Sequence, residues 1–390
     1  MPADHSKFVV VGAGLAGAAT AWQLATAGHE VTILERGVPA DAAGSSHGSA
    51  RIFRYAYPSE AYTRMVVRAW DLWRELEEVS GTQLITPSGA LDFGVLREPA
   101  RLAGVLDKVG IDHELFDSAA ASQRWPQFAF ESSVLWHPGA GVIDAESSVA
   151  TMIGLAVSRG ARLLSGWEVS SVEHDGQGYV LHNRAGEGIH AERVVVAAGG
   201  WLPSLLGRLG LPADFLAQMP VLQVLQEQAY HFPYRDQATP WPTFIHKNEV
   251  LQTYGLPGGR DASYRGQKVA QYCGGRAIPS AEHQGGAIDP ANRARVVAHV
   301  ERYLPGLVPE PYAETTCLFT NTPTEDFVID RYEGITLVSP CSGHGAKFAP
   351  LIGSVAAEAA AASSVEAARS HIPAQFLLPH APAHHEGGTW

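Results

Sequence analysis

Residues 7–17 read Lys-Phe-Val-Val-Val-Gly-Ala-Gly-Leu-Ala-Gly, and after a helical pattern residues 31–35 read Val-Thr-Ile-Leu-Glu. This order predicts a buried strand, a glycine turn, a helix and a second strand that ends in an acid. Gly12 can adopt a backbone angle that a side chain would forbid, Gly14 lets the main chain approach a pyrophosphate, and Gly17 lets the helix lie close to the strand. The three glycines therefore predict a dinucleotide-binding turn.

The ligand predicted for this turn contains ADP. Its phosphates would lie at the helix N-terminus, where free backbone N–H groups and the helix dipole stabilise an anion. Glu35 follows roughly twenty residues later, where a carboxylate can accept both hydroxyls of an adenosine ribose. Glycine turns also occur for packing alone, but here the whole strand–turn–helix–strand context is present. NAD and FAD both fit this stretch, which does not decide between them.

The composition narrows the class of protein. A chain of 390 residues exceeds the usual size of one hydrophobic core, so two domains are expected. The net charge of −12 gives no general electrostatic reason to bind nucleic acid or an anionic membrane.

Cysteine usage and the lack of targeting signals predict a soluble cytoplasmic protein, and the chain is expected to be a monomer. Cys273, Cys317 and Cys341 are far apart and odd in number, which argues against a disulfide framework. No cysteine pair has metal-site spacing, so no metal is expected. The N-terminus lacks a cationic segment followed by an apolar run, and the sequence has no apolar stretch of about 18 residues.

A small-residue loop, residues 43–54, follows the predicted nucleotide unit and carries Arg51 and Arg54. Serine and glycine make flexible loops and arginines are usually solvated, which is the simpler interpretation. It does not explain two arginines three residues apart in a small, partly apolar segment. These arginines could face a buried anion, such as an electron-rich flavin ring or a substrate carboxylate.

Two further regions predict the rest of the fold. Residues 192–201 predict a buried strand that ends at Gly199-Gly200, a second close approach to the nucleotide that resembles flavoproteins more than simple NAD dehydrogenases. Strand-like runs between residues 220 and 275 alternate with Pro- and Gly-rich turns, which predicts an antiparallel sheet over the reactive end of the cofactor. Helices are expected over residues 60–79, 98–109, 118–125 and 288–304, and in segments that end near residues 159 and 362.

A glycine turn at residues 342–345 precedes the last of these helices. It predicts a site for negative charge, such as the charge that develops at the N1/C2 carbonyl end of a reduced flavin.

Together these motifs resemble the D-amino-acid-oxidase superfamily, on the branch of monomeric sarcosine oxidase and N-methyltryptophan oxidase. The resemblance covers nearly the whole chain. The residues that carry it, besides the first glycine turn and Glu35, are Gly44-Ser-Ser-His-Gly48 with Arg51 and Arg54, Cys317 with Thr320, Thr322, Pro323 and Asp330, and Ser342-Gly-His-Gly-x-Lys347.

The resemblance implies an α/β fold with two domains. A Rossmann-like FAD-binding domain would comprise residues 1–86, 143–219 and 317–375. An α+β substrate domain on a mostly antiparallel sheet would comprise residues 87–142 and 220–316. Residues 376–390 would form a tail.

The resemblance also implies FAD rather than NAD, bound covalently through a thioether between Cys317 and the flavin 8α carbon. The simpler alternative is a buried inert cysteine; Cys273 and Cys341 do not match the linking position and are expected to be structural. The implied cofactor contacts are Gly12, Gly14, Gly17, Glu35, Arg36, Ser46, His47, Arg51, Gly199, Cys317, Gly343, His344, Gly345 and Lys347.

Catalytic and substrate roles follow from the same resemblance. Arg54 and Lys347 would pair with the substrate carboxylate, and His47 and Arg51 would lie beside the flavin ring. Lys268 would lie near the flavin N5, where a cation stabilises superoxide as it forms; without the resemblance it would be taken for a surface lysine on a strand. The implied pocket wall comprises Tyr254, Phe319 and Tyr272.

Departures from the family pattern concern the substrate. Phe319 replaces an active-site tyrosine of sarcosine oxidase, Tyr272 stands where a histidine is found near the flavin, and Cys341 replaces a phenylalanine. Sarcosine itself is therefore in doubt, and a bulkier or cyclic secondary amino acid is open.

The function expected is oxidation of a secondary amino acid to an imine, with oxygen reduced to hydrogen peroxide. Alternatives are a cyclic imino acid oxidase in a biosynthetic tailoring step, a dehydrogenase that passes electrons to a quinone or a partner protein, and a non-catalytic flavoprotein.

Overall fold

The predicted glycine turn joins β1 (Asp4–Val11) to α1 (Leu15–Thr26) in the computed structural model, which describes residues 4–379. Gly12 has a φ of +101°, and a Cβ there would lie 2.5 Å from the carbonyl oxygen of Ala197. A Cβ on Gly17 would lie 1.9 Å from the carbonyl oxygen of Gly12. Only glycine fits at both positions, because the backbone of a neighbouring segment fills the space that a side chain would need.

The first sheet has a parallel centre and antiparallel margins. Parallel pairing orders five strands as β9-β2-β1-β12-β20, while β10 and β11 extend the sheet beyond β12 and β19 pairs antiparallel with β20. The other strands of this sheet are β2 (Val31–Glu35), β9 (Arg162–Ser165), β10 (Val169–His174), β11 (Tyr179–Asn183), β12 (Gly188–Val196), β19 (Val328–Tyr332) and β20 (Ile335–Ser339).

Both faces of the parallel centre are covered, so its strands are continuously apolar rather than alternating. All five residues of β2 are buried. On one side α1 packs against α5 (Ala145–Ser158) and α9 (Ala349–Ala361), which enclose a hydrophobic core with the sheet. A second core on the other side includes residues of α6 (Leu202–Leu205), α7 (Ala213–Leu216) and the β10–β11 ribbon.

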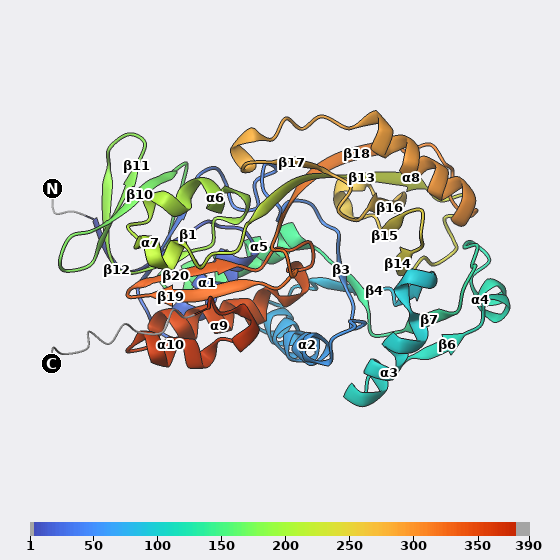
Figure 1. Cartoon of the computed structure of the whole chain (residues 1–390), viewed down its shortest axis with the longest axis horizontal. Coiled ribbons are helices and arrows are strands. Elements are labelled where there is room, and N and C mark those ends of the chain that lie inside the picture. Colours follow the sequence, from blue (N-terminus) through green and yellow to red (C-terminus); the bar gives the residue numbers. More distant parts are fainter. Residues whose placement is uncertain (1–3, 380–390) are drawn as a thin grey trace, which may run out of the picture.

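The second sheet is mostly antiparallel, as predicted, and lies at the opposite end of the molecule from the β10–β11 ribbon (Figure 1). Its one parallel pairing joins β5 to β14. Its strands are β5 (Ala90–Phe93), β6 (Glu114–Phe116), β7 (Val134–His137), β13 (Gln223–Pro233), β14 (Thr243–Lys247), β15 (Gln252–Pro257), β16 (Gly266–Gln271), β17 (Arg276–Ile278) and β18 (Ala313–Asn321).

The sequence did not predict β18, which pairs along β13 over nine residue pairs. The expected boundary between domains at residue 317 therefore falls inside a strand of the second sheet. The expected tail begins at residue 376, and its residues 380–390 lie outside the described part of the chain.

A third sheet is small and carries the arginine loop. It orders β3 (Arg51–Phe53), β8 (Gly141–Ile143) and β4 (Ile85–Pro87). The expected helices are present with small shifts at their ends: α2 (Glu60–Ser80), α3 (Pro99–Val109), α4 (Ser118–Arg124) and α8 (Pro290–Tyr303), followed near the C-terminus by α10 (Val365–His371). Gly81 ends α2 with a φ of +66°, a left-handed conformation that glycine adopts readily after a helix C-terminus. Within residues 4–379, none of the helices combines the length and apolar character needed to span a bilayer.

Candidate active site

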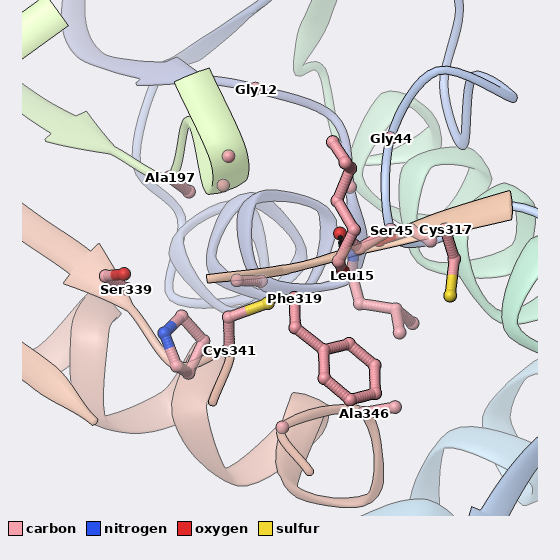
Figure 2. A pocket seen from close by; sticks show the side chains of 18 of the residues that line it. Gly12, Leu15, Gly44, Ser45, Ala197, Cys317, Phe319, Ser339, Cys341 and Ala346 are labelled. Carbon is pink, nitrogen blue, oxygen red and sulfur yellow. Dashed lines mark hydrogen bonds between the residues drawn. The ribbon is translucent and has the colours of Figure 1, made fainter. Parts of the chain in front are cut away.

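One cavity of about 600 Å³ is lined by both large sheets. Gly12 and Glu35 of the first sheet contribute to its wall, and so do Lys268 and Cys317 of the second. Figure 2 shows Cys317 and Phe319 leaving the same strand, with Gly12 and Ala197 at a distance across the pocket. The two ends of the predicted cofactor site therefore belong to one space.

The nucleotide end has the features that a dinucleotide needs. The N-cap of α1, Gly14, has no side-chain capping bond, and Ser46 Oγ accepts a hydrogen bond from the Leu15 amide at 3.0 Å. Glu35 accepts hydrogen bonds from the amides of Ala13 (2.7 Å) and Gly37 (2.9 Å), which fix its carboxylate at the cavity wall. These residues fit an ADP group, because amides and one carboxylate, rather than bulky side chains, line this end.

Other residues expected at this end divide into two groups. Gly199 lines the cavity, as does Arg36, whose guanidinium lies 4.4 Å from the centre of the Trp201 ring. Gly17 does not line the cavity and acts through the close contact between α1 and the turn.

The reactive end is one face of the second sheet. Side chains alternate along a strand, so Cys317 and Phe319 of β18 share a face. Register places Tyr254 of β15 opposite Ala270, two residues from Lys268 on β16. Tyr254, Lys268, Cys317 and Phe319 all line the cavity.

Lys268 is 5% exposed, so it is not a surface lysine. Burial lowers the pKa of its ammonium to about 8, and the nearby Arg51 cation lowers it further while Cys317 and Asp261 act in the opposite direction. Its charge therefore changes close to neutral pH.

Cys317 is half-buried in the same wall, and burial raises the pKa of its thiol while the Lys268 and Arg51 cations lower it. Its cross-strand neighbour Glu227 is buried, and desolvation raises the pKa of that carboxyl to about 7. Cys341, expected to be structural, also lines the cavity. The thiol thus borders the cavity, and the two cations offset part of the effect of burial on its pKa.

The loop before β3 is held by Arg51. Its guanidinium donates to the carbonyl oxygens of Ser45 and His47, both at 2.8 Å, and Ser45 Oγ donates to the Leu318 carbonyl oxygen at 2.7 Å. Arg51 lines the cavity, but His47 does not. Burial lowers the pKa of His47 to about 4, so its ring is neutral at physiological pH.

Arg54 and Lys347 meet at a tyrosine that the sequence did not single out. Lys347 is 4% exposed and its Nζ donates to Tyr57 Oη at 2.9 Å and to the His344 carbonyl oxygen at 2.7 Å. The Arg54 guanidinium lies 4.5 Å from the centre of the Tyr57 ring and donates to the Ala56 carbonyl oxygen. Within residues 4–379 neither cation has a carboxylate partner, and burial lowers the pKa of Lys347 well below its usual value.

A buried ion pair lies next to Arg54, because Arg97 and Arg54 donate to the same Ala56 carbonyl oxygen. Arg97 is bonded to Asp92, which also contacts His137 Nε2 at 3.2 Å, and Arg97 donates to the Ala56 carbonyl oxygen at 2.9 Å. Arg97 lines the cavity. The sequence did not indicate this pair, because no motif connects Asp92 and Arg97 with the distant loop that carries Arg54.

The turn at residues 342–345 also borders the cavity. The Cys341 carbonyl oxygen accepts hydrogen bonds from the amides of His344 (3.0 Å) and Gly345 (3.1 Å), and Gly343 has a φ of +70°. A Cβ on Gly343 would lie 2.8 Å from the Phe319 ring. A short 3₁₀ turn separates this loop from α9, so the helix begins later than the sequence suggested.

The rest of the pocket wall is aromatic with a charged rim. The Tyr272 and Phe319 rings lie 6.1 Å apart, and Tyr272 Oη donates to Glu325 at 2.8 Å. Lys247 Nζ lies 5.1 Å from the centre of the Tyr272 ring. Lys247 and Glu325 line the cavity and were not identified from the sequence.

Comparison with known proteins agrees with this geometry. Residues 7–359 match the profile of a family described as FAD dependent oxidoreductase (DAO). The chain is 30% identical to a monomeric sarcosine oxidase of Streptomyces avermitilis over 90% of this chain and 92% of that protein. It is 28% identical to an N-methyl-L-tryptophan oxidase of Citrobacter koseri over 91% of this chain and 95% of that protein. A structure of NikD, described as an unusual amino acid oxidase essential for nikkomycin biosynthesis, superposes with a TM-score of 0.81 at 24% identity, over 96% of this chain and 98% of that one.

Proposed function

This chain belongs to the FAD dependent oxidoreductase family, and we propose that it oxidises a secondary amino acid to an imine with oxygen as the electron acceptor. The observation that carries the proposal is one cavity in which an ADP-type turn meets Lys268 and Cys317, together with Arg54 and Lys347, which form no ion pair with the described residues. The relatives named sarcosine oxidase and N-methyl-L-tryptophan oxidase support a substrate that has both a carboxylate and a secondary amine.

Arg54 and Lys347 would hold the substrate carboxylate. Both cations flank Tyr57, and an entering carboxylate would supply the partner that they lack. A substrate held there would lie in the same cavity as Lys268 and Cys317 of the second sheet. Proximity and orientation of this kind lower the barrier without a strong base, because the substrate amine can bind already deprotonated.

FAD, when bound, would accept a hydride equivalent from the carbon next to the substrate nitrogen. The imine product is then hydrolysed by water. Lys268 would act in the oxygen step: a buried ammonium stabilises the negative charge that develops as oxygen is reduced toward hydrogen peroxide.

We propose further that the cofactor is attached through Cys317. The thioether would replace a C–H bond of the flavin 8α methyl group, with the protons released to solvent and the two electrons passed through the flavin to oxygen. Its thiol faces the cavity, where burial raises its pKa and the Lys268 and Arg51 cations oppose that rise. Acid precipitation tests this attachment: yellow colour should stay with the protein pellet, and Cys317→Ser should release it to the supernatant. Colour lost from the unaltered protein would exclude the linkage.

The decisive experiment for the reaction is a panel of N-methyl and cyclic amino acids, each matched with its primary amine, assayed for hydrogen peroxide. Peroxide formation with at least one secondary amino acid is the expected result. If no compound of the panel yields hydrogen peroxide with oxygen but at least one is oxidised with an artificial electron acceptor, the protein is a dehydrogenase.

A further inference from the structure

Five cations at the reactive end of the cavity form no ion pair with a carboxylate in the described part of the chain: Arg51, Arg54, Lys247, Lys268 and Lys347. Arg51 is expected beside the flavin ring, and the proposed function already gives Lys268 a role in the oxygen step. Arg54 and Lys347 are two of them, and their bonds go to carbonyl oxygens and to Tyr57. Lys247 is the remaining cation: its ammonium has no hydrogen bond or ion pair within residues 4–379 and lies against the Tyr272 ring. One substrate carboxylate matched to Arg54 and Lys347 leaves Lys247 unmatched.

Strand geometry directs Lys247 into the cavity. It lies at the end of β14 two residues after Ile245, so the two side chains share a face. Ile245 is opposite Tyr254 of β15, and all three residues line the cavity. Lys247 is half-buried, so its ammonium is held at the wall rather than extended into solvent.

The charges around Lys247 favour the binding of an anion. Burial lowers the pKa of its ammonium, and the Arg97 and Arg54 cations lower it further. Asp92 is already bonded to Arg97. Glu325 raises the pKa of Lys247, but this carboxylate is exposed, accepts a hydrogen bond from Tyr272 and forms no ion pair with the lysine. An anionic ligand would relieve the repulsion between these cations.

We propose that the substrate carries a second anionic group that pairs with Lys247, so that the enzyme takes an acidic secondary amino acid rather than a neutral one. This inference rests on the proposed function, in which Arg54 and Lys347 hold the first carboxylate. The second group is an anion at the end of the substrate opposite the first carboxylate. Either a carboxylate or a phosphonate can supply it. Lys247 then determines specificity and takes no part in the electron transfer.

Binding to the flavin-loaded protein tests the proposal without turnover. The probes are pentanoate, glutarate and 3-phosphonopropionate, and the dissociation constant of each is measured by calorimetry and by perturbation of the flavin absorbance. At least one of the two doubly charged ligands should bind about tenfold more tightly than pentanoate. Which of the two binds more tightly identifies the second group, and a series from malonate to adipate gives the spacing between the two anions.

The decisive variant is Lys247→Met, which keeps the length and apolar body of the side chain. It should remove the advantage of the doubly charged ligands and leave pentanoate binding within about twofold. Lys108→Met is the matched control: this exposed lysine on α3 is outside the cavity wall, and its loss should preserve the advantage. Lys247→Arg should retain most of it.

Two results would overturn the proposal. One is a wild-type protein that binds pentanoate as tightly as every doubly charged probe, which needs no variant to fold. The other is a Lys247→Met protein that keeps the full advantage. Failure of the proposed reaction is a separate outcome, recognised by the absence of secondary amine oxidation with any acceptor while ligand binding is still measurable.

Discussion

The two ends of the cavity present opposite kinds of group to a ligand. At the end formed by Gly12 and Glu35, the wall consists of glycines, backbone amides and one carboxylate. At the other end, Lys268 and Lys347 are nearly fully buried cations, and desolvation lowers the pKa of both. A backbone amide at a helix start carries its polarity as part of the fold, whereas a buried ammonium without a partner is costly.

The two ends should therefore differ in the substitutions that they tolerate. The nucleotide end depends on the absence of atoms, because a Cβ at Gly12 or Gly17 would meet backbone. The reactive end depends on the presence of charge, since its cations are stabilised when an anion enters. Added atoms should therefore damage the first end, and removed charges the second.

The largest effect is expected when the charge of Lys268 is removed. Lys268→Met should slow the reaction of the reduced enzyme with oxygen by about 10²–10³-fold, because one preorganised charge no longer stabilises the developing anion. Stopped-flow mixing of the anaerobically reduced holoenzyme with oxygen measures this step alone. Lys268→Arg is the control that keeps the charge and should retain most of the rate. Equal rates in the wild type and the Met variant would remove Lys268 from the oxygen step.

Arg54 should show the next largest effect, and in binding rather than in the oxygen step. Arg54→Ala should weaken carboxylate binding about 30-fold, or about 2 kcal/mol, since truncation leaves the substrate anion with Lys347 alone. Titration of the holoenzyme with a carboxylate ligand measures the dissociation constant. Arg54→Lys should recover part of the loss, because it restores the charge without the planar fork. An unchanged dissociation constant would refute the assignment of Arg54 to the carboxylate.

At the nucleotide end the informative change is a single added methyl group. Gly17→Ala should lower the free energy of unfolding by about 1–3 kcal/mol, because the new Cβ would lie 1.9 Å from the Gly12 carbonyl oxygen. Gly154→Ala is the matched control at an exposed position of α5, where no neighbouring segment lies within 4 Å of the added Cβ, and it should raise stability by about 0.5–1 kcal/mol. Denaturant unfolding of both variants measures the difference. A Gly17 variant as stable as the control would show that α1 can move away from the turn.

The nucleotide end could be predicted from the sequence because it is local. A strand, a turn and a helix that follow one another in the chain place Gly12, Gly14 and Glu35 with no need for long-range pairing. The same holds for α2, whose apolar face and Gly81 cap can be recognised within one segment.

The reactive end could be predicted only in part, because it depends on register between distant strands. Lys268 and Cys317 face the same cavity since β13 pairs with both β16 and β18. Residues 313–321 mix threonines with single apolar residues and gave no clear strand period, so β18 was missed. Tyr57 and Lys247 belong to no motif at all. Their positions in the cavity depend on packing between distant segments, which the periodicity of a sequence does not predict.

The smallest expected effect is a pH dependence that separates the two half-reactions. Burial lowers the pKa of Lys268 to about 8, so its ammonium is charged below that pH and neutral above it. The oxygen step should therefore slow by no more than about tenfold per pH unit as the pH rises through 8. Reduction by substrate should instead become faster with rising pH, since the bound amine must be deprotonated.

Separate stopped-flow measurements of the two steps between about pH 7 and pH 10 test these opposite slopes. Lys268→Arg should flatten the oxygen profile, because an arginine stays charged throughout this range. If the oxygen step still slows above pH 8 in the Arg variant, another group is responsible for the titration. Lys268 would then not determine the pH dependence of this step.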